Sequence, residues 1–209
     1  MKLPCLLSLL LLSLLAVGCA GPSGSRANSY SAKAAEPDTR AMFFPPPLAD
    51  DWTKWIVGEW EGEGGGNAGT GRGTVRYEMT LGGQFLICRG QGEITELDPD
   101  YLKKHMHATD DEIERFRRSG YQALEIYTID PKTGEVIGFL FDSLRCVATG
   151  KGKRDGDKEV VEWAWRTGYK STRITERLSA AKMMVIERTF KPDGNLMTEE
   201  KGEFTRIKK

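Results

Sequence analysis

Charge of one sign, histidine and long hydrophobic runs are all scarce in this sequence. Lysine plus arginine and aspartate plus glutamate number 30 each, and there are only two histidines among 209 residues. A balanced chain creates no strong field to attract nucleic acid, so we expect no nucleic-acid partner. Beyond residue 18, no apolar run reaches the length of a membrane-spanning helix.

The first residues form a separate unit. Lys2 and the leucine-rich segment Leu6–Val17 have the pattern of a secretion signal, and the segment is too short to span a bilayer comfortably. The signal ends in Leu-Ala-Val-Gly-Cys, which resembles the lipobox of bacterial lipoproteins. The resemblance implies that Met1–Gly18 is removed and that Cys19 is lipidated as the first residue of the mature protein. Ordinary secretion without lipidation is the alternative.

The lipobox resemblance also implies where the protein is held. Several acyl chains on Cys19 would give near-permanent anchoring, since a single chain binds a membrane only marginally. Ala20 follows the cysteine, where Asp would be the inner-membrane retention signal of enteric bacteria, so we expect a cell-envelope protein on the outer membrane facing the periplasm. Residues 19–50 are rich in Ser, Ala, Gly and Pro and are predicted to be a flexible linker.

The remaining segment, 51–209, is predicted to be one β domain. Turn signals recur at short intervals and separate short strand-like segments, which is typical of an antiparallel meander. About ten strands in one small domain would leave exposed edges unless the sheet closes into an up-and-down barrel. The clearest turn signals are Leu81-Gly82-Gly83-Gln84, Asp130-Pro131-Lys132-Thr133-Gly134 and Lys191-Pro192-Asp193-Gly194-Asn195.

Alternation along the segments agrees with half-buried strands. Three sets of residues each share a strand face: Val161, Trp163 and Trp165; Ile174 and Leu178; Met184, Ile186 and Phe190. Asp51–Ile56 is predicted to form a short helix. A second interruption, at about 98–119, has Asp98-Pro99 as a helix start and Thr109 with Glu112 in capping-box spacing. It is predicted to be a helical insertion over one mouth of the barrel.

Gly58-Glu59-Trp60-Glu61-Gly62 resembles the Gly-x-Trp signature of lipocalins and their relatives, the calycins. Leu81–Leu86, Asp130–Gly134 and Phe141–Ser143 follow in the order seen in an uncharacterised bacterial lipocalin-like family of unknown function. The resemblance implies a ten-stranded calycin-type barrel and supplies no established activity. It also implies that Trp60 packs beneath Arg206 from the last strand, in a structural role.

A small barrel can enclose one apolar or amphipathic ligand, and the insertion would then act as its lid. Tyr127, Trp163, Trp165 and Arg173 are the candidate lining residues, although a filled structural core explains them equally well. The alternative function is a non-enzymatic envelope protein with a packed barrel that meets another protein. Interior volume separates the two, because a ligand pocket needs roughly 300 Å³ or more.

No residue pattern identifies a cofactor, a metal site or a catalytic group. Nitrobindin-like barrels hold haem through a histidine near the C-terminal strands, but His105 and His107 both lie in the insertion. Their i, i+2 spacing on a predicted loop does not make a metal site. Ser179-Ala180-Ala181-Lys182 falls in a turn and does not indicate an enzyme, and Gly64–Gly69 is predicted to be a flexible loop instead of a phosphate-binding turn.

Cys88 and Cys146 are the thiols of the mature domain other than Cys19. An oxidising compartment permits a disulfide between them. The alternative is two separate buried thiols, which behave as small apolar groups.

Overall fold

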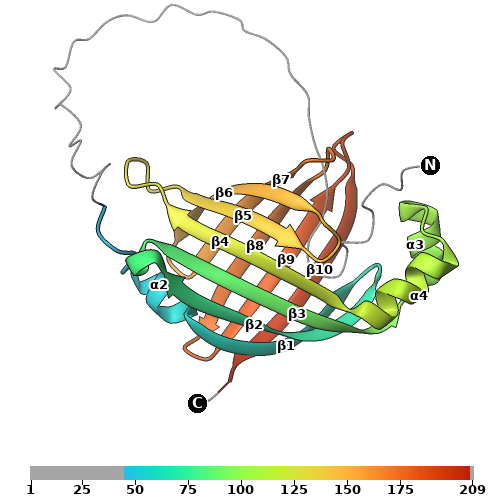
Figure 1. Ribbon diagram of the computed structural model, residues 1–209, viewed down its shortest axis with the longest axis horizontal. Coiled ribbons are helices and arrows are strands. Elements are labelled where there is room, and N and C mark those ends of the chain that lie inside the picture. The colour runs from blue at the N-terminus through green and yellow to red at the C-terminus, as the bar shows by residue number, and fades with distance from the viewer. Residues whose placement is uncertain (1–44, 208–209) are drawn as a thin grey trace, which may run out of the picture.

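The computed structural model describes residues 45–207, which form a closed antiparallel barrel (Figure 1). Each strand pairs with the next along the chain, and β1 pairs with β10 to close the sheet. The predicted ten-stranded up-and-down barrel is therefore confirmed. The strands are β1 (Gly58–Gly66), β2 (Gly69–Thr80), β3 (Phe85–Leu97), β4 (Tyr121–Ile129), β5 (Val136–Asp142), β6 (Val147–Asp155), β7 (Lys158–Trp165), β8 (Lys170–Ser179), β9 (Lys182–Phe190) and β10 (Leu196–Arg206).

The predicted turns join neighbouring strands as hairpins. The Asp130 carboxylate accepts hydrogen bonds from the backbone N–H groups of Lys132 (2.8 Å) and Thr133 (2.9 Å), which fixes the β4–β5 turn. Gly134 and Gly194 adopt positive φ angles of 71° and 85° where the β4–β5 and β9–β10 turns end. Glycine suits these positions because a Cβ disfavours the left-handed conformation.

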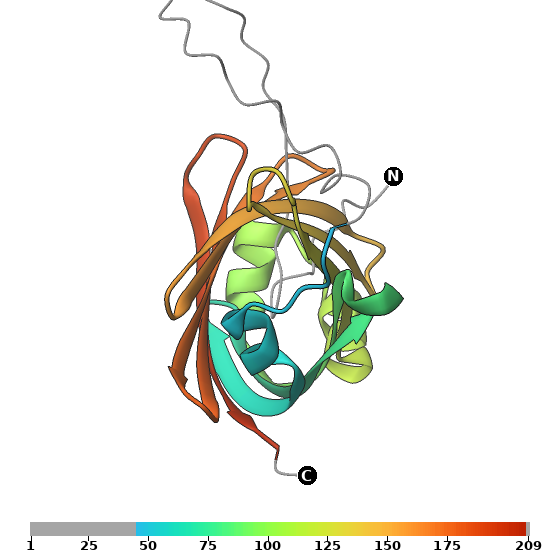
Figure 2. The ribbon, with the colours of Figure 1, turned by 90° about the vertical axis from the view of Figure 1, so that its left-hand side faces the viewer.

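Helices lie at the two ends of the barrel. The helix α2 (Asp51–Ile56) lies at one end, and α3 (Pro99–Met106) and α4 (Asp110–Ser119) lie at the other (Figure 1). Figure 2 looks along the barrel from the α2 end and shows α3 and α4 beyond the lumen. Thr109 and Glu112 form the predicted capping box. His107 ends α3 with φ 56°, so the predicted insertion consists of two helices separated by a short break.

The α2 end is closed by aromatic side chains. Trp60 is fully buried, and its indole N–H donates to the backbone oxygen of Ile56 at 2.8 Å. The guanidinium carbon of Arg206 lies 4.1 Å from the centre of the Trp60 ring. Arg206 also donates to the backbone oxygens of Val57, at 2.7 Å, and of Trp55. The structure thus brings together the two residues expected to form the structural contact of the calycin barrel.

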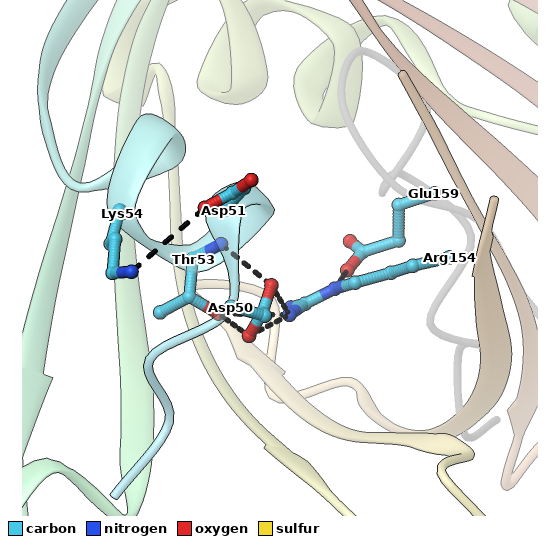
Figure 3. Close-up of polar contacts among 6 residues, drawn as sticks. All are labelled: Asp50, Asp51, Thr53, Lys54, Arg154 and Glu159. Atoms are coloured by element: carbon cyan, nitrogen blue, oxygen red, sulfur yellow. Dashed lines mark hydrogen bonds and ion pairs between the residues drawn. The ribbon is translucent and has the colours of Figure 1, made fainter. Parts of the chain in front are cut away.

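Arg154 ties α2 to the barrel wall, as Figure 3 shows. Its Nε donates to the Glu159 carboxylate at 2.6 Å, and its Nη1 donates to Asp50 at 3.0 Å and to Thr53 at 2.8 Å. Burial by itself would raise the pKa of Asp50, but the hydrogen bonds from Thr53 and the Arg154 charge outweigh it and hold this pKa below its ordinary value. The helix and the β6–β7 hairpin are therefore joined by a charged network.

The predicted linker ends in contact with the barrel. The backbone N–H of Leu48 donates to the oxygen of Gly83 at 2.8 Å, and the Gln84 side chain donates to the oxygen of Pro45 at 3.0 Å. The signal sequence, Cys19 and the rest of the linker lie outside the described residues, so their assignments stay predictions. Among residues 45–207, no helix is long and apolar enough to cross a bilayer.

Candidate functional site

The barrel interior contains charged side chains on strands whose apolar residues face outward. On β8 the buried residues are Ser171, Arg173 and Thr175, whereas the apolar pair Ile174 and Leu178 is partly or fully exposed. On β9 the buried Glu187 alternates with Ile186. The alternation predicted from the sequence is present, but the polar set occupies the interior on β8, and on β9 the interior set combines Glu187 with the apolar Met183 and Val185.

Arg173 spans the lumen and joins two carboxylates. Its Nη1 donates to both oxygens of Glu125 on β4, at 2.9 and 2.8 Å, and its Nε donates to Glu187 on β9 at 2.9 Å. The arginine is 8% exposed, and both glutamates are more deeply buried. Because buried charges need partners, this ion-pair cluster links opposite walls of the barrel and holds Arg173 in one orientation.

Neighbouring polar groups complete the cluster. The Tyr127 hydroxyl donates to Glu125, and the Ser171 hydroxyl donates to Glu187 at 2.8 Å. Burial raises the pKa of Glu187, although the Arg173 charge acts in the opposite direction. Burial, followed by the Glu125 charge, also raises the pKa of Tyr127 well above its ordinary value. The phenol is therefore a donor throughout the neutral range.

The four predicted lining residues lie in one buried layer, but they make different contacts. The Trp163 ring fits over Gly138 and Gly150, where an added Cβ would come within 2.8 Å of the indole. Tyr127 meets the Trp163 ring edge to face at 5.9 Å, and Arg173 lies 5.4 Å from the centre of the same ring. The Trp165 N–H donates to Ser171 at 3.4 Å. Of the four, Arg173 lines the interior cavity and the three aromatic residues pack beside it.

A cavity of about 100 Å³ lies inside the barrel between this cluster and the strands β1, β2, β3 and β10. Many of the residues of those strands that border the cavity are glycines, which contribute no side chain to fill the space. The exposed surface of the lining is mostly apolar. The glycines bordering the cavity are Gly62, Gly64, Gly65, Gly71, Gly73, Gly90, Gly92 and Gly202.

Gly90 borders open space. A Cβ added there would meet only Val75, at 3.6 Å, which is an ordinary van der Waals distance. At Gly62, Gly64 and Gly73, by contrast, an added Cβ would come within 2.7 Å of the neighbouring strand. Those three glycines permit close strand approach, whereas Gly90 leaves part of the cavity empty.

Two buried polar groups border the cavity without a hydrogen-bond partner in the described part of the chain. They are the Nη2 of Arg173 and the Oε1 of Glu200 on β10. Burial, followed by the nearby Glu187 charge, raises the pKa of Glu200 well above its ordinary value. The raised pKa favours the neutral Glu200 carboxyl, which can donate a hydrogen bond.

Cys88 faces the same interior as a free, buried thiol. Across the sheet, Cys88 pairs with Glu125, Glu125 pairs with Leu140, and Leu140 pairs with Ala148. Ala148 is two residues from Cys146, so the two cysteines are three strands apart. At about 4.8 Å per strand, this is roughly 14 Å along the sheet, beyond the limit of about 7 Å between bridged cysteines. The Cys88–Cys146 disulfide is therefore absent, and Cys88 follows the alternative of a buried thiol.

Two further expectations need correction. The segment 64–69 is largely strand: Gly64–Gly66 belong to β1 and Gly69 to β2, and the two strands stay paired as far as Gly66 and Gly69. The insertion stands at one end of the barrel, yet among the residues that line the cavity none belongs to α3 or α4. The helices therefore do not form a lid against the cavity.

Sequence reasoning missed Glu125, Glu187 and Glu200. Only their positions could have identified them. Each glutamate lies at an inward-facing position of its strand, opposite a residue of the neighbouring strand, as Glu187 lies opposite Arg173. A second hollow was also missed. It is an open groove of about 950 Å³ of mixed polar and apolar character, bordered mainly by residues of β1, β2 and β3, among them Glu61, Arg72 and Glu93.

Comparison with known proteins locates the fold. No family model and no curated protein matches the chain. Among solved structures, the S-type phycobiliprotein lyase CPES from Guillardia theta has a TM-score of 0.50 at 9% identity, over 76% of this chain and 92% of that one. The fold is that of a lipocalin-like barrel. At this identity the likeness concerns the fold alone.

Two other similar structures have lower scores. Rv2717c from M. tuberculosis has a TM-score of 0.48 at 12% identity and covers 74% of this chain and 94% of its own. The redesigned β-barrel mFAP0, solved bound to DFHBI, has a TM-score of 0.39 at 11% identity and covers 73% and 99%.

Proposed function

We propose that this protein is a binding protein that holds a small, mostly apolar molecule inside its barrel. The observation that carries the proposal is the cavity of about 100 Å³, lined by glycine and apolar side chains together with Arg173 and the carboxyls of Glu125, Glu187 and Glu200. A mostly apolar pocket with a few fixed polar groups is the usual form of a small-molecule site. The Arg173 cluster supplies such groups in a fixed orientation.

The volume limits the size of the ligand. Pockets for drug-sized molecules begin at roughly 300 Å³, whereas an engineered apolar cavity of about 150 Å³ binds benzene. The cavity therefore suits a molecule no larger than benzene and excludes a long acyl chain in this conformation. It falls short of the roughly 300 Å³ expected for the predicted ligand pocket, so the proposal is confined to a small ligand.

The predicted lipid anchor at Cys19 gives the binding domain a location. In the proposal, the linker and anchor hold the barrel at a membrane of the cell envelope, with the outer membrane preferred. Binding would then occur in the compartment into which the protein is exported. Export of the anchored protein is tested by labelling it with palmitate and by the loss of that label in Cys19→Ala.

The function is tested by native mass spectrometry of the protein purified from its own host without denaturation. We expect a small molecule to be bound in a one-to-one ratio and to be released on unfolding. Gly90→Val should lose it, because the added side chain enters the cavity. Ala164→Val, on the exposed face of β7, is the matched control and should retain it.

An empty barrel whose Gly90→Val variant is unchanged in every binding measurement would instead favour the packed envelope protein that meets another protein. Copurification of a stoichiometric partner with both valine variants would point the same way. These results separate a ligand site from a structural interior.

A further inference from the structure

The charges around the cavity restrict what can enter it. Four of the charged residues that border the cavity have exposed side chains. Two of these, Arg72 and Glu93, pair with each other outside the barrel. The interior groups are three carboxyls, Glu125, Glu187 and Glu200, and one guanidinium. Arg173 is already paired with the first two carboxylates. An anionic ligand would therefore lose its hydration and gain no unpaired positive charge.

A cationic ligand is disfavoured for a different reason. It would have to approach within reach of Arg173, whose Nη2 borders the cavity without a partner. The Glu125 and Glu187 carboxylates, which could attract a cation, are already held by Arg173. The carboxyl that remains unpaired is Glu200, whose neutral form is favoured because burial raises its pKa, so a buried cation gains little compensation for lost water.

Two buried polar atoms remain available to a ligand. Arg173 Nη2 donates, and Glu200 can donate in its neutral form, which burial favours by raising its pKa. A buried donor without a partner is costly, so a ligand that accepts from both relieves an existing penalty. Apolar atoms of Val75, Ala123, Met183 and Val185 border the rest of the space.

We infer that the ligand is a small uncharged molecule with a carbonyl or similar acceptor oxygen, which accepts hydrogen bonds from Arg173 and Glu200 while its hydrocarbon part fills the space beside Gly90. This assignment rests on the proposed function, since it names the class of molecule that the cavity takes. It excludes fatty-acid carboxylates and amines as the preferred occupants.

The test compares three probes of equal size on the full domain: 2-butanone, propionate and sec-butylamine. Their binding is measured at neutral pH by titration, following the backbone and Trp indole N–H signals in two-dimensional NMR. We expect 2-butanone to bind at least about tenfold more tightly than either ion, because the ions must give up hydration that the cavity does not replace.

Substitutions at Glu200 identify the donor. Glu200→Gln keeps an N–H donor of similar shape and should keep ketone affinity within about twofold, whereas Glu200→Leu removes the donor and should weaken it about five- to tenfold. Glu203→Gln, on the exposed face of the same strand, is the matched control and should change nothing. Each variant is first checked for an unchanged NMR fingerprint elsewhere in the barrel.

The outcomes separate the inference from the function it rests on. If propionate or sec-butylamine binds as tightly as the ketone, and Gly90→Val still abolishes binding, the cavity site stands and the neutral-acceptor assignment is overturned. If Glu200→Leu binds the ketone unchanged, the assignment is overturned as well. If none of the three probes binds and the protein from its host is empty, the proposed function itself fails.

Discussion

The Arg173 cluster makes the sharpest prediction about the molecule. Arg173→Met removes the only guanidinium that pairs with Glu125 and Glu187 in the described interior, and it leaves both carboxylates buried. Breaking a buried pair from one side costs about 3–5 kcal/mol. The methionine side chain keeps most of the volume, so the loss reflects charge and hydrogen bonding more than packing.

The assay is urea unfolding followed by tryptophan fluorescence. With an m-value of about 2 kcal/mol/M, a loss of about 4 kcal/mol lowers the midpoint by about 2 M. Without Arg173 the pKa of Glu187, already raised by burial, rises further. A carboxyl whose folded pKa is raised stabilises below its unfolded pKa and loses that contribution as pH rises, so the deficit should grow from acidic to neutral pH.

Two companion variants test the physical cause. Adding Glu125→Gln and Glu187→Gln to Arg173→Met removes the unpaired charges and should restore most of the lost stability. Arg188→Met breaks an exposed pair with Glu199 and should change stability by less than about 0.5 kcal/mol. If Arg173→Met unfolds at the wild-type urea concentration, the cross-lumen ion pairs do not support the barrel and the reasoning is refuted.

Three further predictions concern other parts of the barrel. Arg206→Ala should destabilise by about 2 kcal/mol in urea unfolding, because it removes the stacking on Trp60 and three hydrogen bonds to backbone oxygens; equal loss in Thr205→Ala would argue against a specific contact. Glu200, whose pKa is raised by burial, should contribute stability that is complete below its ordinary pKa of 4.5 and lost as pH rises, and Glu200→Gln should flatten that dependence. Cys88 should resist iodoacetamide in the native state and react after unfolding, since burial raises its thiol pKa, and rapid native labelling would contradict its placement.

Much of the fold could be predicted because its signals are local. Gly134 and Gly194 ended turns at the expected places, and Thr109 with Glu112 marked the start of α4. The α2 helix also has the predicted bounds. These features depend on residues close together in sequence, where turn and capping chemistry apply directly.

The site was harder to predict because it depends on contacts between distant strands. Glu125 and Arg173 meet at a sequence separation of 48, and the pattern of β9 placed Met184, Ile186 and Phe190 on one face without assigning Glu187 to the interior. Alternation shows that two faces differ but not which one is inside. The glycines were read as a loop because a glycine opposite a cavity and a glycine in a turn look alike in a sequence.

The central claim is that the barrel interior, and no other surface, takes a small neutral molecule. The most direct measurement is an NMR search for intermolecular NOEs between bound 2-butanone and the methyl groups of Val75, Ala123, Met183 and Val185, which border the cavity. The account predicts NOEs to these methyl groups in the wild-type protein and their loss in Gly90→Val. Contacts confined to the open groove beside Glu61, Arg72 and Glu93, or unchanged contacts in Gly90→Val, would contradict it.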